Sequence, residues 1–310
     1  MPTKLKVCAV NFWPGFSLQA GFVRYLLETA IGAFEIAADE KSADIVLSSV
    51  FPRFQRLLAI HPKLKLKTPK FPEKTIGVLW ENLRPNYSQY AYSISSDFDS
   101  YGGRNVRVPL WYGQLNWPGF NRGAPSDWHG YEPLIEIESL LAPRPACKPG
   151  EHELFCCFVA ANPELHRMLA VEALSRVEPV DLFGPITGKP YKGSKYDLLK
   201  RYRFNLCFEN SAFPGYFTEK LLHSWAGGCI PLYYSGPGFE RDFNPRAVIN
   251  RKDYMTLDEF AEGVARIHRS PDLWGPIYAE PLLTQAPSLA LATDFLRGAC
   301  DSIMNRKVTL

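Results

Sequence analysis

The sequence lacks the patterns that mark several common classes of protein. It has no apolar run that approaches the roughly 18 residues a membrane-spanning helix requires. Its 35 Lys and Arg residues exceed its 32 Asp and Glu residues by only 3, without long basic runs, so a nucleic-acid-binding surface is not indicated. Residues 1–6 are polar and lead directly into an apolar segment, so no signal peptide is expected.

Motifs that bind metals or phosphate loops are also missing. None of the 6 histidines has the spacing of a zinc motif, and the Gly pairs at 102–103 and 227–228 fit neither GxGxxG nor the Walker pattern. The 7 cysteines contain no CxxC, and an odd number argues against a disulfide framework. We therefore expect buried, reduced thiols in a cytoplasmic protein.

The remaining composition suits a large α/β protein. Hydrophobic residues make up 46% of 310 residues, which is enough core for one large or two modest domains. In the first half, apolar segments that resemble strands alternate with a helical pattern at 18–29. The predicted strands are 5–12, 44–50, 75–80, 90–94 and 106–110. Such alternation predicts a parallel sheet with helices on both faces.

A break in this pattern divides the chain. Residues 143–150 contain three prolines and a glycine, which is typical of a linker. A second series begins with a strand at 154–161 and a helix that we expect to start with Asn162 as N-cap and Pro163 at its first position. Further helices are predicted at 257–269 and 288–304. The sequence thus predicts two Rossmann-like domains, residues 1–148 and 149–310.

The segment 203–254 is the most informative. The strand 204–208 is mostly apolar on both faces, as in a buried parallel strand, and it ends in the polar Glu209, Asn210 and Ser211. A turn then leads to a helix that opens with Thr218, Glu219 and Lys220. Ligands bind beyond the carboxyl ends of parallel strands, and helix N-termini favour anions. These features predict a phosphate-sugar site with Lys220 as a cation.

Four motifs in this segment closely resemble the signature region of the α1,3/4-fucosyltransferases, glycosyltransferase family 10. They are FNLCFENS, GYFTEK, IPLYY and DFNPRAVINRKDY. The resemblance implies a GT-B fold, in which two Rossmann-like domains face each other across a cleft. It implies that the first domain binds the acceptor, that the second binds GDP-fucose, and that the last helix returns to the first domain. It also implies the soluble bacterial type, with a cytoplasmic location or peripheral attachment to the inner membrane.

Glu81 is the candidate catalytic base. It follows the strand 75–80, and its surroundings, WENLRPN, resemble the family's GEN-x-x-PN element, whose Glu is the proposed base. The departure from that element is Trp80, which stands where a small residue is expected. The competing interpretation of Glu81 is a strand-end carboxylate paired with Arg84. A base that acts directly on an acceptor hydroxyl fits an inverting single displacement, whereas a carboxylate nucleophile gives retention.

The resemblance also supplies the donor-binding residues. FVAANPELHR is similar to the family's FVxSNP…R, whose Arg contacts the diphosphate, and TEK supplies a second cation. It places Glu219 beside the ribose or the fucose ring, where a carboxylate can stabilise positive charge, which makes it the second catalytic candidate. The expected donor-binding residues are Arg167, Asn210, Tyr216, Thr218, Glu219 and Lys220. The competing interpretations are a solvated side chain for Arg167 and Lys220, helix capping for Thr218 and an ordinary first-turn position for Glu219. For Asn210 the alternative is turn formation, and for Tyr216 it is core packing.

The predicted reaction is the inverting transfer of L-fucose from GDP-β-L-fucose to GlcNAc O3 of an N-acetyllactosamine-type glycan. Transfer to O4, another nucleotide-sugar donor, and binding without turnover remain alternatives. No metal or other cofactor is expected to be required, because fixed cations can stabilise the leaving diphosphate. Asp97 and Asp99 have the DxD spacing of metal-dependent transferases, but a turn explains them better. No nucleic acid partner and no transmembrane segment are expected.

Aromatic residues in the first domain suit stacking on acceptor sugars, although core packing explains several of them equally well. The oligomeric state stays open. The aromatic residues concerned are Phe12, Trp13, Phe16, Tyr87, Trp111, Tyr112, Trp117 and Trp128.

Overall fold

The computed structural model describes residues 4–51, 68–123, 132–148, 150–187 and 193–308. The chain forms two compact units, and each contains one parallel sheet, as the predicted α/β fold class requires. The first unit comprises Met1–Gly113, Trp117–Tyr131 and Ser288–Leu310, and the second comprises Gln114–Asn116 and Glu132–Pro287. Residues 132–148 therefore belong to the second unit, ahead of the boundary expected at 148/149. The cleft expected between the domains stays a prediction.

The first unit is built on a six-stranded sheet in the order β2-β1-β3-β4-β5-β6, with every pair parallel. The strands are β1 (Lys6–Val10), β2 (Glu35–Ile36), β3 (Ile45–Ser48), β4 (Thr75–Leu79), β5 (Tyr92–Ser95) and β6 (Asn105–Arg107). All residues of β3 and β4 are buried, because helices or loops cover both faces of a parallel sheet. The sequence indicated five of these strands and missed β2, whose two residues are exposed.

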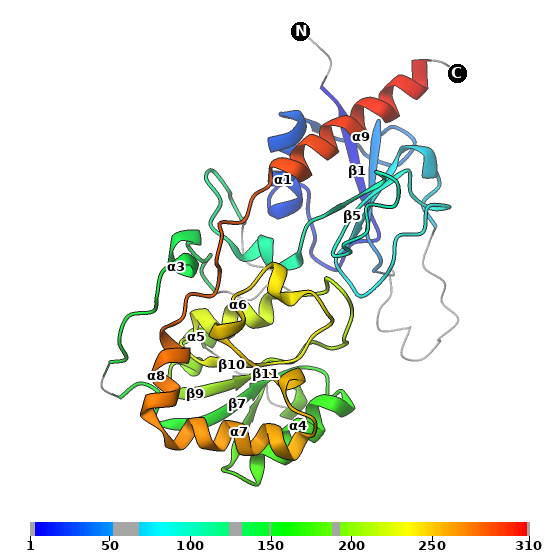
Figure 1. Ribbon diagram of the computed structural model, residues 1–310. Helices are drawn as coiled ribbons and strands as arrows, with labels where there is room; N and C mark the ends of the chain where they lie inside the picture. Colours follow the sequence, from blue (N-terminus) through cyan, green and yellow to red (C-terminus); the bar gives the residue numbers. More distant parts are fainter. Residues whose placement is uncertain (1–3, 52–67, 124–131, 149, 188–192, 309–310) are drawn as a thin grey trace. The chain divides into compact units, whose positions relative to one another are not determined.

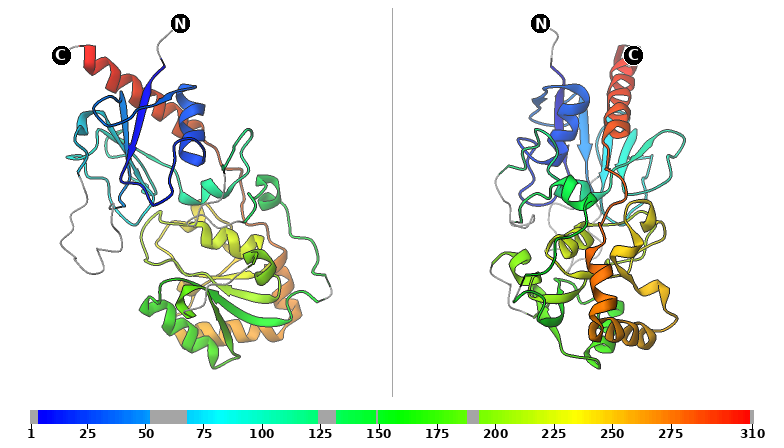
Figure 2. Two further views of the ribbon diagram at one scale, coloured as in Figure 1. Left: turned by 180° about the vertical axis from the view of Figure 1, so that it is seen from behind. Right: turned by 60° about the vertical axis from the view of Figure 1, so that its left-hand side comes forward.

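Two helices that are far apart in the sequence pack together in the first unit. Helix α1 (Phe22–Ile31) lies beside α9 (Ala290–Val308), and Figures 1 and 2 show the two side by side in every view. The Nε atom of Arg297 donates a hydrogen bond to the carbonyl of Ala30, 3.0 Å away. The last helix thus belongs to the same unit as the first strand. No helix in the described ranges has the length and apolar character to cross a membrane.

The second unit contains a five-stranded parallel sheet in the order β11-β10-β9-β7-β8. Helices α4 and α7 lie on one side of it and α5 and α6 on the other (Figure 1). The strands are β7 (Leu154–Val159), β8 (Val180–Phe183), β9 (Tyr202–Leu206), β10 (Ile230–Tyr233) and β11 (Ile249–Asn250). The helices are α3 (Ile137–Leu141), α4 (Leu165–Ser175), α5 (Lys195–Leu199), α6 (Glu219–Ala226), α7 (Leu257–Arg269) and α8 (Pro271–Ala279).

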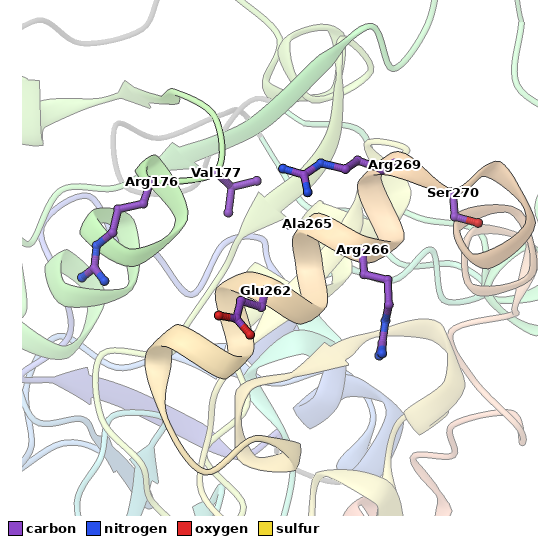
Figure 3. A pocket seen from close by; sticks show the side chains of 7 residues that line it. All are labelled: Arg176, Val177, Glu262, Ala265, Arg266, Arg269 and Ser270. Atoms are coloured by element: carbon purple, nitrogen blue, oxygen red, sulfur yellow. The ribbon is translucent and has the colours of Figure 1, made fainter.

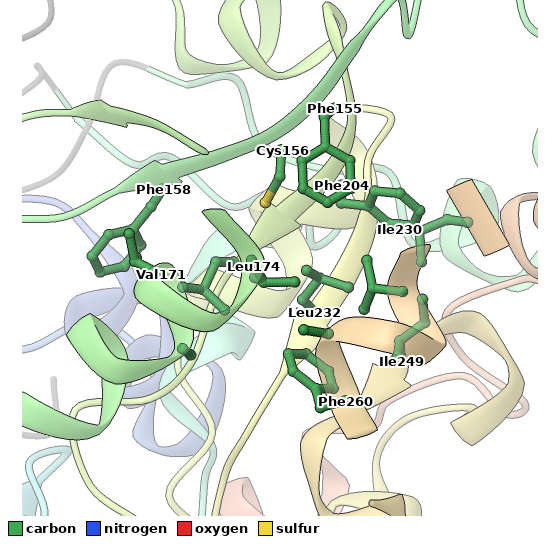
Figure 4. Packing of buried hydrophobic residues seen from close by; sticks show 14 of the residues in the cluster. Phe155, Cys156, Phe158, Val171, Leu174, Phe204, Ile230, Leu232, Ile249 and Phe260 are labelled. Atoms are coloured by element: carbon green, nitrogen blue, oxygen red, sulfur yellow. The ribbon is translucent and has the colours of Figure 1, made fainter. Parts of the chain in front are cut away.

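The main core of the second unit lies between the sheet and helices α4 and α7. Phe155, Phe204 and Leu232 from three strands meet Leu174 and Phe260 from the two helices (Figure 4). Each such side chain stabilises the fold by about 1.5–3 kcal/mol when fully buried. A smaller cluster on the other face includes Cys157 and Cys229. All 7 cysteines are free thiols and all except Cys147 are buried, as expected.

The start of α4 differs from the prediction. The helix begins at Leu165 with Glu164 at the cap position, so the expected Asn162 cap and Pro163 first position are wrong. The carbonyl of an N-cap residue accepts the first intrahelical hydrogen bond, a role that Glu164 takes instead of Asn162. The Asn162 carbonyl accepts a hydrogen bond from Arg167 Nη1 at 3.0 Å. The loop conformation therefore supports the guanidinium instead of extending the helix.

Candidate functional site

A buried carboxylate lies at the centre of the candidate site in the second unit. Glu209 follows β9, its side chain is 0% exposed, and its backbone N–H extends the pairing to Tyr234. Its oxygens accept hydrogen bonds from the Thr218 N–H at 2.8 Å, the Thr218 hydroxyl at 2.9 Å and the Tyr233 hydroxyl at 3.0 Å. Because a buried charge is costly unless it is hydrogen-bonded, these donors and Lys220 make its position stable. Glu209 thus fixes the start of α6 against the end of β9.

Lys220 is held at this helix start. Thr218 caps α6, as expected, and its hydroxyl also accepts from Lys220 Nζ at 3.0 Å. Lys220 Nζ lies 3.3 Å from Glu209 Oε2, and the side chain of Lys220 is 19% exposed. Burial opposes the charge of Lys220, but Glu209 and Glu219 outweigh it and raise its pKa. A solvated helix lysine, the competing interpretation, does not fit these contacts.

Glu219 is the first residue of α6 and is partly accessible. Its side chain is 32% exposed, and its Oε1 lies 3.9 Å from Lys220 Nζ. Desolvation acts to raise its pKa, yet nearby positive charge, chiefly that of Lys220, lowers it to about 2. Glu219 therefore stays ionised at neutral pH, which is the state required to stabilise positive charge on a ligand.

Arg167 is buried beside the same strand end. It is 2% exposed, its Nη1 donates to Asn210 Oδ1 at 3.1 Å, and its guanidinium carbon lies 4.7 Å from the centroid of the Phe158 ring. Within the ranges that the structure describes, its Nε atom has no hydrogen-bond partner. Burial lowers its pKa. The solvated arginine that competed with the donor-binding role is excluded, and Arg167 and Asn210 are brought together.

Tyr216 lies in the turn that precedes α6. It is 4% exposed, and its N–H donates to the Phe213 carbonyl at 3.1 Å. The turn approaches Gly236 so closely that a Cβ there would lie 1.9 Å from the Phe213 oxygen, so a larger residue cannot fit without moving the turn. Core packing explains the burial of Tyr216, and its contact with a donor stays a prediction.

Glu81 lies in the first unit, directly after β4 and next to Trp80. Glu81 is partly buried, and Arg84 forms an ion pair with Asp97. The role of Glu81 as base and its competing pairing with Arg84 both stay predictions. Trp80 is 7% exposed, and its Nε1 donates to the Val108 carbonyl at 2.9 Å. The Trp80 side chain is thus part of the core of the first unit. This is how the protein accommodates a large side chain at a position where a small one was expected.

The DxD pair forms a turn, as the sequence indicated. Asp97 accepts from the Tyr101 hydroxyl at 2.6 Å and from the Asp99 N–H at 3.2 Å, while Asp99 accepts from the Tyr101 N–H at 2.8 Å. Burial acts to raise the pKa of Asp97, but Tyr101, Asp99 and Arg84 lower it overall. Among the residues that the structure describes, no group of three or more His, Cys, Asp or Glu side chains could hold a metal ion.

A hollow of about 320 Å³ opens in the first unit at the carboxyl end of β1. Phe12, Trp13 and Phe16 line it, with the rings of Phe12 and Phe16 stacked at 3.8 Å between centroids. Trp13 also lies 6.4 Å from the Trp80 ring, beside Glu81. Part of the aromatic set expected to contact an acceptor therefore gathers near the candidate base, whereas Trp128 lies outside the described residues.

A larger hollow, of about 430 Å³, lies between the end of α4 and α7 in the second unit (Figure 3). Its lining includes Arg176, Glu262, Arg266 and Arg269, and none of the predicted site residues. Arg269 points toward Val177 in Figure 3, while Arg176 is paired with Asp258 at 2.6 Å. This hollow is therefore separate from the site at the start of α6.

Sequence reasoning missed three polar residues around the site. Glu209 was recognised only as a polar strand end, although a glutamate that follows a mostly apolar strand is a signal for a buried, satisfied charge. Lys195 and His223 gave no motif. They meet through tertiary contacts between α5 and α6, with Lys195 Nζ 3.4 Å from His223 Nδ1.

In the second unit, a βαβ segment thus places a cation and a carboxylate at the start of a helix, the arrangement expected for a nucleotide-sugar site. Residues 149–278 match the model of glycosyltransferase family 10 (fucosyltransferase), C-terminal region. This match covers less than half of the chain and lies within the second unit, where the sequence predicted the resemblance to this family.

Proteins named as fucosyltransferases are similar to parts of this chain. The chain is 29% identical over 232 residues to the alpha-(1,3)-fucosyltransferase FucT of Helicobacter pylori, covering 68% of this chain and 48% of that protein. It is 34% identical over 104 residues to a human 3-galactosyl-N-acetylglucosaminide 4-alpha-L-fucosyltransferase, covering 32% of this chain and 28% of that protein. The chain spans about half the length of the bacterial relative and less of the human one.

Solved structures confirm the predicted fold type. A crystal structure of an alpha1,3-fucosyltransferase with GDP superposes with a TM-score of 0.72 at 22% identity, covering 97% of this chain and 91% of that chain. The structure with GDP-fucose gives a TM-score of 0.70 at 23% identity, with the same coverage. The chain therefore has the two-sheet α/β fold of that fucosyltransferase.

Proposed function

We propose that the protein catalyses the inverting transfer of L-fucose from GDP-β-L-fucose to a glycan hydroxyl, and specifically to GlcNAc O3 of an N-acetyllactosamine-type acceptor. The observation that supports this best is the arrangement of Lys220, Glu219 and Arg167 around the buried Glu209, in a segment that matches the family model. The same proposal places the reaction in the cytoplasm and requires no nucleic acid partner.

The proposed mechanism is a single displacement. The acceptor oxygen attacks C1 of fucose from the face opposite GDP, and Glu81 removes the proton of that hydroxyl. The bond from C1 to the diphosphate oxygen breaks, and its electron pair leaves with GDP. Lys220 and Arg167 stabilise the negative charge on the diphosphate, while Glu219, ionised at neutral pH, stabilises positive charge on the fucose ring or binds the ribose.

A transfer assay tests the proposal directly. Purified protein is incubated with GDP-fucose and N-acetyllactosamine, and the product is analysed by mass and linkage. Fucose at GlcNAc O3 supports the donor, the reaction and the regiochemistry together, whereas fucose at O4 corrects only the last. If GDP does not bind while UDP does, the donor is a different nucleotide sugar. If GDP binds and an acceptor array yields no product, the protein is a binder.

Replacing Lys220 with alanine is expected to weaken GDP binding by about 1.5–3 kcal/mol, the value of a hydrogen bond to a charged group. Calorimetric titration with GDP measures this loss. The matched control is Lys200→Ala, which removes an exposed lysine in the same unit and should leave the affinity unchanged. An unaltered GDP affinity in Lys220→Ala would remove Lys220 from the donor site.

Removal of divalent cations is expected to leave transfer activity in place. Fixed cations on α4 and α6 can stabilise the leaving diphosphate, and Asp97 and Asp99 are engaged in a turn. The measurement compares initial rates before and after EDTA treatment. If activity is lost completely and Mg²⁺ or Mn²⁺ restores it, the proposal is contradicted. That result would support a metal-binding role for the DxD pair.

A further inference from the structure

Lys195 opens α5 and is anchored by a buried carboxylate. Its backbone N–H and the Ser194 hydroxyl donate to the two oxygens of Glu132, the latter at 3.1 Å. Glu132 is 8% exposed. The backbone from which the Lys195 side chain extends is therefore fixed within the second unit.

His223 directs the Lys195 amine. Lys195 Nζ lies 3.4 Å from His223 Nδ1, and His223 Nε2 lies 3.3 Å from Gln114 Oε1. A carbonyl oxygen only accepts, so Nε2 carries the hydrogen and Nδ1 accepts from the ammonium group of Lys195. His223 is 7% exposed and packs against the Tyr196 ring, which restricts it to one orientation.

This contact brings Lys195 to the functional face of α6. His223 follows Glu219 by four residues, so the two side chains lie on one face of the helix. The charge of Lys195 interacts with those of Glu219 and Lys220. Burial lowers the pKa of Lys195, as expected for an amine that no carboxylate contacts directly.

The charges of the site make this lysine significant. Lys220 is ion-paired with the buried Glu209, whose charge also acts on Arg167, while the charge of Glu219 acts on Lys220 and Lys195. Lys195 forms no ion pair in the part of the chain that the structure describes. Its ammonium group is thus a third cation beside those of Lys220 and Arg167, while Glu132 is engaged by the Lys195 backbone and the Ser194 hydroxyl. A diphosphate is multiply anionic and binds best where positive charge is in excess.

We infer that Lys195 is a third cationic residue of the donor site, held by His223 to contact the diphosphate of the nucleotide sugar. This inference rests on the proposed function and deepens it, because it assigns a residue that the family signature does not include. Lys195 acts on the leaving group, and His223 is a positioning residue that acts through Lys195.

Lys195→Met tests the inference, since methionine retains the length of the side chain and removes its charge. Calorimetric titration is performed with GDP and with guanosine, which lacks the diphosphate. We expect GDP affinity to fall by about 10- to 100-fold, with guanosine affinity within about 2-fold of the wild type. The matched control is Lys200→Met, an exposed lysine at the other end of α5. It should change neither affinity.

The outcomes separate this inference from the proposed function. Equal GDP affinity in wild type and Lys195→Met overturns the inference alone. Equal losses for GDP and guanosine also overturn it, because they assign Lys195 to the structure of the base site. If the wild type binds UDP but not GDP, the proposed donor is wrong, and the same comparison is made with UDP and uridine. Failure of the wild type to bind any nucleoside diphosphate overturns both.

His223 variants test the positioning role. The Oδ1 atom of asparagine can replace Nδ1 as an acceptor for Lys195, so His223→Asn should retain GDP affinity to within about 3-fold, whereas His223→Ala should lose about 10-fold. In the Lys195→Met background, His223→Ala should add little further loss, because both changes remove one interaction. Additive losses would show that His223 acts independently of Lys195.

Discussion

Replacing Glu81 with glutamine is expected to reduce fucosyl transfer by roughly 10²–10⁴-fold while GDP affinity stays within about 2-fold of the wild type. Glutamine has nearly the same shape as glutamate but cannot accept the proton of the acceptor hydroxyl. Glu81 belongs to the first unit, and the donor-binding residues belong to the second, so donor affinity should be insensitive to the change. Initial rates and GDP titration measure the two quantities.

The chain offers a close control for this experiment. Glu73 lies just before β4, at the strand end opposite Glu81, and it is exposed. Glu73→Gln should retain full activity. Transfer at near wild-type rates by Glu81→Gln would show that another group is the base, and a parallel loss of GDP affinity would indicate a disturbed structure.

Replacing Glu209 with alanine is expected to lower the free energy of unfolding by about 3–5 kcal/mol, the usual cost of removing one partner of a buried ion pair. The change leaves the Thr218 N–H, the Tyr233 hydroxyl and the Lys220 ammonium group without their shared acceptor. Because Thr218 caps α6, the helix start should become less ordered, and GDP affinity should fall as well. Urea denaturation measures the stability.

Glu209→Gln and Glu240→Ala complete this comparison. Glutamine keeps an acceptor oxygen but not the charge. The free energy of unfolding of Glu209→Gln should therefore lie between those of the wild type and Glu209→Ala. Glu240 is an exposed residue of the same unit, and its replacement should change stability by less than about 0.5 kcal/mol. If Glu209→Ala lowers the free energy of unfolding by less than about 1 kcal/mol, the buried network contributes little to stability.

Local signals in the sequence predicted most of the fold and part of the site. Helix α7 has the predicted bounds, because the Thr256 cap and the strong amphipathic pattern define both of its ends. The start of α6 was predicted from Thr218, and the strand that precedes α6 was predicted from an apolar run. By contrast, β2 is too short for a periodic signal, and the start of α4 depends on the contact of the Asn162 carbonyl with Arg167.

Tertiary contacts decided what the sequence could not predict. Glu209, Lys195 and His223 are ordinary residues in their local context, and their importance depends on neighbours up to 109 positions away, as in the contact of His223 with Gln114. A family signature identifies residues that recur at fixed spacing. It does not show which of the charges are already paired, and that information came from the buried pair of Lys220 and Glu209.

The pairing of α1 with α9 has a consequence for synthesis of the chain. The first unit requires residues from both ends of the sequence, since Leu296, Ala299 and Ile303 of α9 are buried. A ribosome that adds about 5–20 residues per second needs roughly 10–35 s to pass from residue 113 to residue 290. During that interval the apolar face of α1 has no partner helix. The first unit therefore cannot complete its core until the second unit has been synthesised.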